Sequence, residues 1–389
     1  MMFSFIKQKE YNWVGVLPFI LAALLWRSDY YRFSLYVAIP IVILYAFFTR
    51  WSIIRNSKYW EPYILLFIWM FISCIVSEYS AESLRIMIPT TATFFLSFAT
   101  YALAKIGSNS KMLFLAFVVL YGSLMYSTFT GDNFTTDFNY ANESERRGNT
   151  VLNSNQYAYF SLFAIMAVRL ILGERKNFRP ILRLLIYIVL IVSACYTALM
   201  TASRQVLLLE IPLLAYFIYY DYIKGHNRYK GMSLLMIIVL LAVGIPYFVS
   251  IYDNSYLAIR AETELDEDAR DYLMKRAIDV GVEQPLFGIG LGADESFSHC
   301  TYTHLFSRCG IVALLGYFLI LYRALKEQWQ SYKLTKDDHY LLYLVCILFY
   351  IVANFFYSYI DQPFMMTILF IIIGESQKYT ITNYGANIV

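Results

Sequence analysis

Residues 181–200 read ILRLLIYIVLIVSACYTALM, and Arg183 is the only charged residue among them. A helix of about 20 residues crosses the hydrocarbon core of a bilayer, so this run is long enough to span a membrane. Apolar runs of roughly 15–22 residues recur along the whole chain, and each has the length of a spanning helix. We therefore expect about twelve spans, near residues 12–26, 33–49, 61–77, 84–104, 112–129, 154–172, 181–200, 205–222, 232–251, 304–322, 339–357 and 361–375.

The composition of the 389-residue chain indicates an all-α integral membrane protein. Apolar residues make up 59% of it, charged residues only 15%, and the mean hydropathy is +0.52. A soluble core cannot hide that much apolar surface, so a bilayer must cover the outside of the fold. The net charge of +3 gives no reason to expect nucleic acid as a partner. We expect one polytopic membrane domain over residues 1–389.

The cysteines and histidines do not indicate a metal site or a disulfide framework. The five cysteines are odd in number and lie mostly inside apolar runs. No carboxylate lies at ligand spacing from His299 or His304, so we expect no zinc or other metal. We expect no cofactor either.

The distribution of Lys and Arg predicts the orientation in the membrane. With the N-terminus in the cytoplasm, nineteen Lys and Arg residues fall in inside loops and ten in outside loops. Because cytoplasmic loops carry the excess of positive charge, both termini are expected in the cytoplasm. Two long loops, residues 130–153 and 252–303, then lie outside. The second contains Leu273, Ala277 and Val280 at helical spacing before Pro285, which predicts a short amphipathic helix on the membrane surface.

Charged residues at the outer mouth of the predicted bundle are candidates for function. A charge at the bilayer centre costs about 2.5–3.5 kcal/mol unless it is paired or hydrated. Arg204, the last residue of TASR at 201–204, is either a snorkelling anchor or a guanidinium fork that binds a phosphate. Glu210 lies inside the eighth span, where it either pairs with an arginine such as Arg308 or takes part in catalysis.

Two histidines stand at the start of the tenth span. His304 and Arg308 are four residues apart, which places them on one face of a helix. His299 and His304 are either polar groups satisfied at an interface, or one of them is a general base that a neighbouring cation keeps neutral. The glycines within residues 288–292 follow no strand, so this loop is interpreted as a flexible turn into the next helix rather than a phosphate-binding loop.

Four elements, in order along the chain, resemble motifs of the O-antigen polymerase and ligase superfamily. Residues 149–158, NTVLNSNQYA, resemble its G-T…N-P-N-x-x-A segment, and residues 201–204 resemble its T-x-S-R element. Arg270 followed by PLFGIGLG at 285–292 is similar to its R…P-L-F-G-x-G-x-G loop. His299, with a glycine eleven residues later, has the spacing of its H-N-x9-G motif.

The chain departs from these motifs at three places. Cys300 replaces the usual Asn after the histidine, and Ser154 replaces the usual Pro of the first segment. After Gly310 the next glycine is Gly316, so the fuller G-x-x-G ending of the ligases is missing. The last departure favours a polymerase over a ligase within the superfamily.

The resemblance implies a GT-C-like, inverting glycosyltransferase that needs no metal and acts at the outer face of the bacterial cytoplasmic membrane. Its donor and acceptor would be polyprenyl-pyrophosphate-linked glycans. His299 would take the proton from the acceptor hydroxyl, while Arg204 and Arg270 would neutralise the leaving pyrophosphate. Arg276 is a further candidate for pyrophosphate binding. The residues expected around these groups are His304, Arg308, Glu210 and Asn155.

We expect this enzyme to polymerise lipid-linked repeat units into O-antigen or capsular polysaccharide, with membrane lipid, a flippase and a chain-length regulator as candidate partners. The alternative within the superfamily is the ligase that transfers finished glycan to lipid A core, and transfer to protein is a third option. An alternative from another class is a transporter or flippase of lipid-linked sugars, which predicts inverted repeats and a midplane site in broken helices.

Cysteine substitution in the loop 252–303 tests the predicted topology. A cysteine introduced at Ser255 or Ser296 should react with a membrane-impermeant thiol reagent in intact cells, because the Lys and Arg distribution places this loop outside. Labelling is compared with that of the unmodified chain. Labelling that occurs only after the inner leaflet is opened would show that the orientation is wrong.

Overall fold

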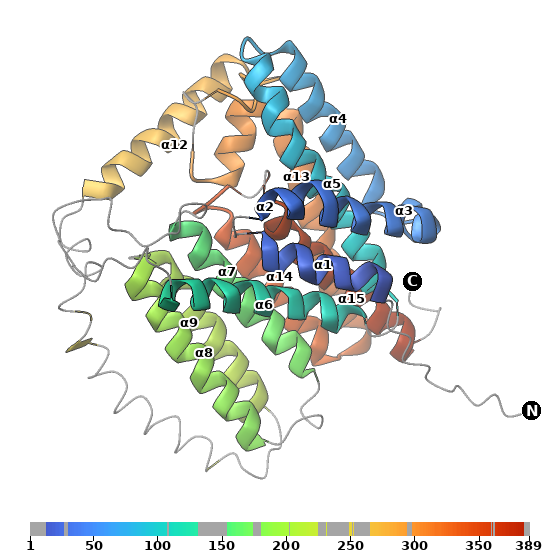
Figure 1. The fold of residues 1–389 in the computed structure, drawn as a ribbon, viewed down its shortest axis with the longest axis vertical. Helices are drawn as coiled ribbons and strands as arrows, with labels where there is room; N and C mark the ends of the chain where they lie inside the picture. Colours follow the sequence, from blue (N-terminus) through green and yellow to red (C-terminus); the bar gives the residue numbers. More distant parts are fainter. Residues whose placement is uncertain are drawn as a thin grey trace, which may run out of the picture. The chain divides into compact units, whose positions relative to one another are not determined.

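The computed structural model describes residues 13–26, 30–106, 109–130, 154–173, 180–201, 203–224, 231, 249–250, 252, 265–293, 298–358, 360 and 362–384. Within these ranges the regular elements are helices (Figure 1). They are α1 (Trp13–Leu25), α2 (Tyr31–Phe33), the π-helix η1 (Ser34–Ala38), α3 (Ile39–Arg55), α4 (Trp60–Val76), α5 (Ser80–Ala104), α6 (Asn109–Thr130), α7 (Ser154–Leu172), α8 (Pro180–Thr201), α9 (Arg204–Ile218), the π-helix η4 (Tyr219–Ile223), α12 (Leu265–Glu283), α13 (Thr301–Thr335), α14 (Asp338–Ala353) and α15 (Pro363–Tyr384).

The all-helical class expected from the sequence is confirmed for the residues that the structure describes. A helix overlaps each predicted apolar run except 232–251, which lies almost entirely outside the described residues. Five helical stretches among the described residues are long and apolar enough to cross a membrane: Tyr31–Arg55, Ser80–Ala104, Asn109–Tyr126, Pro180–Leu199 and Thr301–Thr335. Shorter apolar helices cover Trp13–Leu25, Trp60–Val76, Tyr157–Leu172 and Asp338–Ala353. The number of spans stays a prediction.

The chain divides into two compact units. Unit 1 combines Met1–Ala116 with Arg270–Val389, and unit 2 is Phe117–Ala269. The candidate residues at 270, 276, 299, 304 and 308 therefore belong to unit 1, and those at 155, 204 and 210 to unit 2. The expectation of one membrane domain over residues 1–389 stays a prediction, as does the external position of residues 130–153, most of which are not described.

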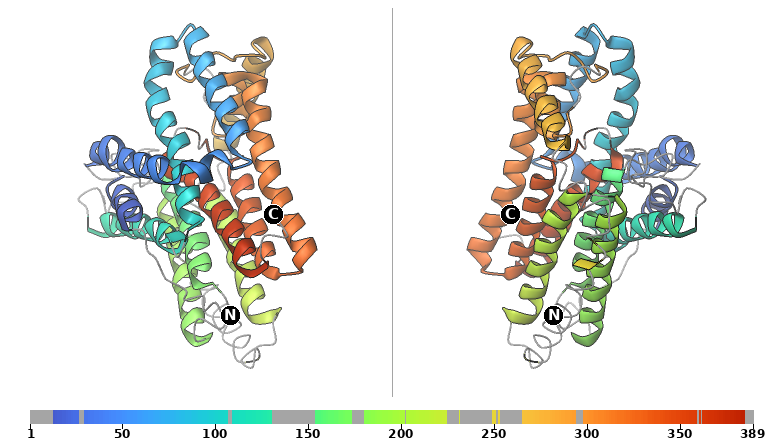
Figure 2. Two further views of the ribbon diagram at one scale, coloured as in Figure 1. Left: turned by 90° about the vertical axis from the view of Figure 1, so that its right-hand side faces the viewer. Right: turned by 90° about the vertical axis from the view of Figure 1, so that its left-hand side faces the viewer.

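Unit 1 is built around α5, which packs against α3, α4 and α15, while α4 also packs against α13 (Figures 1 and 2). Tyr63 of α4 lies 4.4 Å from the ring of Phe94 and 4.9 Å from the rings of Phe98 and Phe370. Gly374 lets α15 approach closely, since a Cβ there would lie 2.6 Å from the carbonyl oxygen of Tyr101. Close approach at small residues and aromatic packing are typical of helix contacts in membranes, where water does not drive association.

Unit 2 contains α7, α8 and α9, which pack against one another and share a buried ion cluster at one end. Asp221 of η4 accepts from Arg169 at 2.8 Å and from Tyr187 at 2.6 Å, and its second ion pair, with Arg183, is 2.9 Å long. The side chains of Arg169, Arg183 and Asp221 are 1–3% exposed. Buried charges are stable only when paired and hydrogen-bonded, so this cluster fixes the end of α7 against α8 and η4.

The predicted loop 252–303 contains α12, which ends two residues before Pro285, and the first residues of α13. Ala277 and Gly281 are buried, and a Cβ on Gly281 would lie 2.4 Å from the ring of Phe306 in α13. Met274, Ile278 and Val282, spaced by four residues, are exposed on α12. One part of the apolar surface of α12 is thus packed on α13, and another part is uncovered within unit 1. The amphipathic helix on the membrane surface stays a prediction.

Candidate active site

The tenth predicted span, α13, is interrupted at Gly310. This glycine has φ +78° and ψ 179°, which is outside the helical region. The carbonyl groups of Ser307 and Arg308, whose helical partners would be residues 311 and 312, accept instead from the amides of Ile289 at 3.0 Å and Gly290 at 2.9 Å. The glycine-rich loop before α13 therefore supplies the hydrogen bonds that the break removes.

The break reverses the direction of the chain. The ring of Tyr302 stacks on that of Phe318 at 5.2 Å and lies 6.2 Å from that of Tyr317. Residues 302 and 318 would be about 24 Å apart along a continuous helix, at 1.5 Å per residue. Thr301–Cys309 thus forms a re-entrant arm, which folds back along the helix that starts at Ile311. The arm reaches back from the break at Gly310 by about 12 Å, to the level of Phe318.

The contact between residues 285–292 and 307–311, which we name the loop–helix clasp, is completed by Ile311, whose amide donates to Pro285 at 2.7 Å. Polar side chains of α4 and α5 hold it from the other side. Trp69 donates to the carbonyls of Leu286 and Cys309, each at 3.1 Å, and stacks on Phe287 at 4.9 Å. Further hydrogen bonds come from Ser73 to Phe287 and Arg308, from Ser77 to Ile289, and from the amide of Gly292 to Ser83.

Glycine is required in the clasp because backbone meets backbone there. Gly288 and Gly290 have φ values of +63° and +97°, which favour glycine. A Cβ would lie 2.1 Å from Ser77 Oγ at Gly290 and 1.9 Å from the Leu286 carbonyl oxygen at Gly310. The interpretation of residues 288–292 as a flexible turn is therefore wrong, because the loop is fixed to α13, α4 and α5.

The clasp is also not a phosphate-binding loop, in agreement with the sequence analysis. Phosphate cradles present free backbone amides to the ligand. Here the amides of Ile289, Gly290 and Gly292 already donate to Ser307, Arg308 and Ser83. These three amides of the clasp are therefore not available to a phosphate.

The arm holds His304 and Arg308, and His299 lies two residues before it. The chain enters it at Ser298, whose hydroxyl accepts from the amide of Cys300 at 3.2 Å and lies 2.7 Å from Thr303 Oγ1. Thr301 fixes the start of the arm to the end of α14, through a backbone bond to Asn354 at 2.8 Å and a hydroxyl bond to Tyr357 at 2.6 Å. The sequence reasoning missed these polar residues because it weighed only charged groups and histidines.

The histidines differ in accessibility. His304 is buried, while His299, just before the arm, is partly exposed, and its ring lies 6.4 Å from that of Tyr357. Arg308 is buried, and its guanidinium donates to the carbonyl of Leu291 in the clasp. The predicted i, i+4 placement of His304 and Arg308 holds within the arm, and Arg308 connects the arm to the loop.

The remaining candidates lie on other elements. Arg270 is in α12, Arg204 begins α9 and Asn155 is in the first turn of α7, but their side chains lie outside the described part of the structure. Arg276 is exposed on α12. Whether these arginines meet His299 at one site stays a prediction.

Glu210 is fully buried in unit 2, where its Oε2 accepts from Ser161 Oγ of α7 at 3.1 Å. Tyr121, in the same unit, lies 2.6 Å from both Ser193 Oγ and Thr197 Oγ1. Glu210 therefore has a partner in unit 2 that the sequence reasoning did not anticipate. Its expected pairing with Arg308 of unit 1 stays a prediction.

The five cysteines are free thiols. Among the described residues there is no group of three or more His, Cys, Asp or Glu side chains that could hold a metal ion. The arm offers the imidazole of His304, the hydroxyl groups of its serine and threonines, and the buried guanidinium of Arg308.

Replacing Gly310 tests the clasp. Gly310→Ala should lower the free energy of unfolding by about 1–3 kcal/mol, the usual cost of a strained backbone position. The added Cβ would also collide with the Leu286 carbonyl, which adds to this cost. The measurement is the melting temperature of the purified protein in detergent. Gly316→Ala is the matched control in the same helix, since its Cβ would lie 3.5 Å from the nearest atom, an ordinary contact. Equal melting temperatures for the two variants would contradict the clasp.

Comparison with known proteins identifies a family for part of the chain. Residues 188–305 match the family model described as O-antigen ligase. No curated protein matches the chain. The matched segment contains Arg204, Arg270, the glycine-rich loop and both candidate histidines. The resemblance inferred from the motifs is thereby confirmed for residues 188–305, which are similar to the O-antigen ligase family.

Proposed function

We propose that this protein polymerises polyprenyl-pyrophosphate-linked oligosaccharide repeat units into O-antigen or capsular polysaccharide. It transfers the growing lipid-linked chain to a new lipid-linked repeat by inverting, metal-independent glycosyl transfer. The observation that carries the proposal is the match of residues 188–305 to the O-antigen ligase family, together with the re-entrant arm in which that segment ends.

In this reaction His299 removes the proton from the acceptor hydroxyl as its oxygen attacks the anomeric carbon of the donor. The bond from that carbon to the pyrophosphate oxygen breaks, and polyprenyl pyrophosphate leaves. Arg204 and Arg270 neutralise the charge that develops on the pyrophosphate, with Arg276 as a further candidate. Cations positioned by the fold replace the metal ion that many phosphate-transfer sites use.

The accessibility of the two histidines supports His299 as the base. A general base must reach the proton that it removes, at hydrogen-bond distance. His299 is partly exposed at the entrance to the arm, whereas His304 is buried between the arm and its neighbours. Arg308 donates to the clasp, which supports a role in positioning the arm rather than in binding pyrophosphate.

The depth of the arm supports a substrate cavity at His299. Residues 298–300 have no regular structure, and the arm starts about 12 Å from the clasp along α13. Irregular backbone at membrane depth is tolerated only where it is buried in protein or lines a water-filled cavity. A hydrated cavity open to the outer leaflet would let the lipid tail of the donor stay in the bilayer while its pyrophosphate reaches the site.

The proposal includes a GT-C-like arrangement of about twelve spans in the cytoplasmic membrane of a bacterium, with both termini inside. The clasp and α12 then lie at the outer face. The exposed Met274, Ile278 and Val282 of α12 fit a helix that rests on the membrane surface.

Two alternatives to a polymerase, a ligase and a transporter, make different predictions. The family description favours a ligase as the second candidate, although the missing G-x-x-G ending after Gly310 argues for the polymerase. A transporter predicts a broken helix whose free backbone groups bind substrate. α13 is broken, contrary to the expectation from sequence, but its freed carbonyls at Ser307 and Arg308 bond to the clasp.

Deleting the gene separates these functions. Loss of the polysaccharide ladder on a gel, with a single repeat unit retained on the surface, is the result expected for a polymerase. Loss of all surface glycan would instead assign the ligase. An unchanged ladder would overturn the proposal.

The arginines are tested by substitution to Ala and to Lys. Arg204→Ala and Arg270→Ala should each lower chain extension about 10²–10³-fold, the usual effect of removing a group that stabilises developing charge. Lys should restore little, because a point charge does not replace a two-pronged hydrogen-bond donor. The readout is the ladder at matched protein level.

Two further variants of α12 serve as comparisons for the arginines. Arg276→Ala shows which arginine of that helix acts, and Lys275→Ala is the control, one residue away, that should leave the ladder intact. Near-normal ladders from both Arg204→Ala and Arg270→Ala would reduce these residues to membrane anchors.

The choice of base is tested by comparing the histidines. His299→Ala should lower polymerisation about 10²–10⁴-fold, the typical contribution of a general base, without loss of folded protein. His304→Ala should leave at least short ladders. The opposite pattern, with His299→Ala active and His304→Ala inactive, would show that the base is His304, five residues later in the chain.

A further inference from the structure

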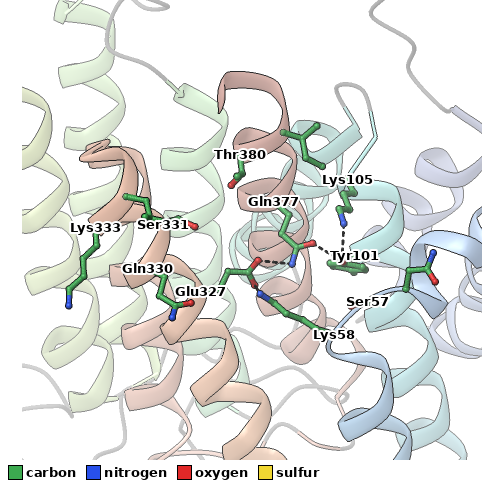
Figure 3. A pocket seen from close by; sticks show the side chains of 13 residues that line it. Ser57, Lys58, Tyr101, Lys105, Glu327, Gln330, Ser331, Lys333, Gln377 and Thr380 are labelled. Carbon is green, nitrogen blue, oxygen red and sulfur yellow. Dashed lines mark hydrogen bonds and ion pairs between the residues drawn. The ribbon is translucent and has the colours of Figure 1, made fainter. Parts of the chain in front are cut away.

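Unit 1 contains a second polar site that the proposed reaction does not use. It is a cavity of about 690 Å³ between the α3–α4 connection, the end of α5, the last turns of α13 and the second half of α15 (Figure 3). Lys58, Lys105 and Lys333 line it together with Glu327, Gln330 and Ser331.

The cavity lies at the opposite end of the helices from the clasp. Lys58 lies two residues before α4, while Ser73 and Ser77, at the other end of that helix, hold the clasp. α4 is about 25 Å long. The cavity and the clasp are therefore at opposite ends of unit 1, and no residue of the arm lines the cavity.

The one acid in its lining is already occupied. Glu327 accepts from Tyr59 at 2.6 Å and from Gln377 at 2.9 Å, and its ion pair with Lys58 is 3.0 Å long. Figure 3 shows the side chains of Glu327, Lys58 and Gln377 pointing toward one another. Burial of the phenol and the neighbouring charge of Glu327 raise the pKa of Tyr59, so Tyr59 stays a donor to this carboxylate.

Two lysines are thus left in excess of the acid. Lys105 contacts the Tyr101 hydroxyl at 3.3 Å, and that hydroxyl donates to Gln377 at 2.7 Å. Burial lowers the pKa of Lys105, and the charge of Glu327 offsets only part of this effect, so an anion in the cavity would stabilise the charged form further. Lys333 lies over the ring of Trp329 at 5.3 Å. Neither contact is with a carboxylate.

The rim of the cavity is apolar. Leu334 and Ile381, which also line it, are 70% and 50% exposed. Gln330, Ser331 and Thr380 add hydroxyl and amide groups to the lining. Lysines beside exposed apolar side chains at the end of membrane helices are the combination that recognises a phospholipid headgroup and its first acyl carbons.

We propose that this cavity binds a phosphate-bearing anion, and that its occupant is the headgroup of an anionic phospholipid. Lys105 holds the phosphate, Lys333 adds positive charge at the other side of the cavity, and Lys58 stays paired with Glu327 (Figure 3). The proposal is independent of the glycosyl-transfer reaction. Only its assignment to the cytoplasmic leaflet depends on the predicted orientation.

Native mass spectrometry of the purified full-length protein tests the lipid. Phosphatidylglycerol should bind more tightly than phosphatidylcholine. Lys105→Gln/Lys333→Gln should weaken that preference at least about fivefold, since one lysine near an anionic headgroup raises the affinity for the lipid about fivefold. Lys105→Arg/Lys333→Arg should keep it. Lys326→Gln is the matched control, because Lys326 lies on α13 over the ring of Tyr322 and does not line the cavity.

A second experiment distinguishes a free anion from a lipid. Inorganic phosphate, added to the delipidated protein in detergent, is followed by the melting temperature. Stabilisation by phosphate that the Gln pair abolishes, without a preference for phosphatidylglycerol, would keep the phosphate site and assign it to a soluble ligand. The proposal is overturned if the wild type binds both lipids equally well and if phosphate stabilises the wild type and the Gln pair to the same extent. For this comparison the two proteins must have the same melting temperature without ligand.

Discussion

Two hydrogen bonds between backbones, from Ile289 and Gly290 to the carbonyls of Ser307 and Arg308, are the contact on which the candidate site depends. A helix in a bilayer cannot break without new partners for the backbone groups that it frees, because lipid offers none. The glycine-rich loop provides those partners, and Gly310 provides the backbone conformation that reverses the chain. The re-entrant arm, and with it the position of His299, follows from this exchange.

The clasp also explains why two separate motifs of this chain belong together. The PLFGIGLG segment at 285–292 and the glycine eleven residues after His299 form the two sides of one contact. Their glycines are needed where a Cβ would touch backbone or a serine hydroxyl. These glycines therefore build the frame of the candidate site, and in the proposed reaction the chemistry falls to the side chains of His299 and the arginines.

The sequence predicted the helices because bilayer thickness sets the length of an apolar run, and it predicted α12 from the spacing of Leu273, Ala277 and Val280. It did not predict the break in α13. An isolated glycine in an apolar run is usually tolerated in a helix, and the bonds that replace the ladder come from residues about twenty positions earlier. The roles of Trp69 and Ser73 were equally hidden, because both sit in a run that hydropathy describes only as a span. The lysine cavity joins four distant segments, which no local pattern reveals.

The central claim is that this chain itself extends lipid-linked glycan. Its most direct test is a reconstitution with purified protein and lipid-linked repeat units alone, in which the length of the lipid-linked product is measured on a gel. A metal-independent polymerase should form longer lipid-linked chains, and should form them equally well in the presence of a chelator. Failure to extend, with transfer appearing only when lipid A core is added, would assign a ligase and contradict the claim. Loss of extension on chelation would contradict the metal-independent mechanism.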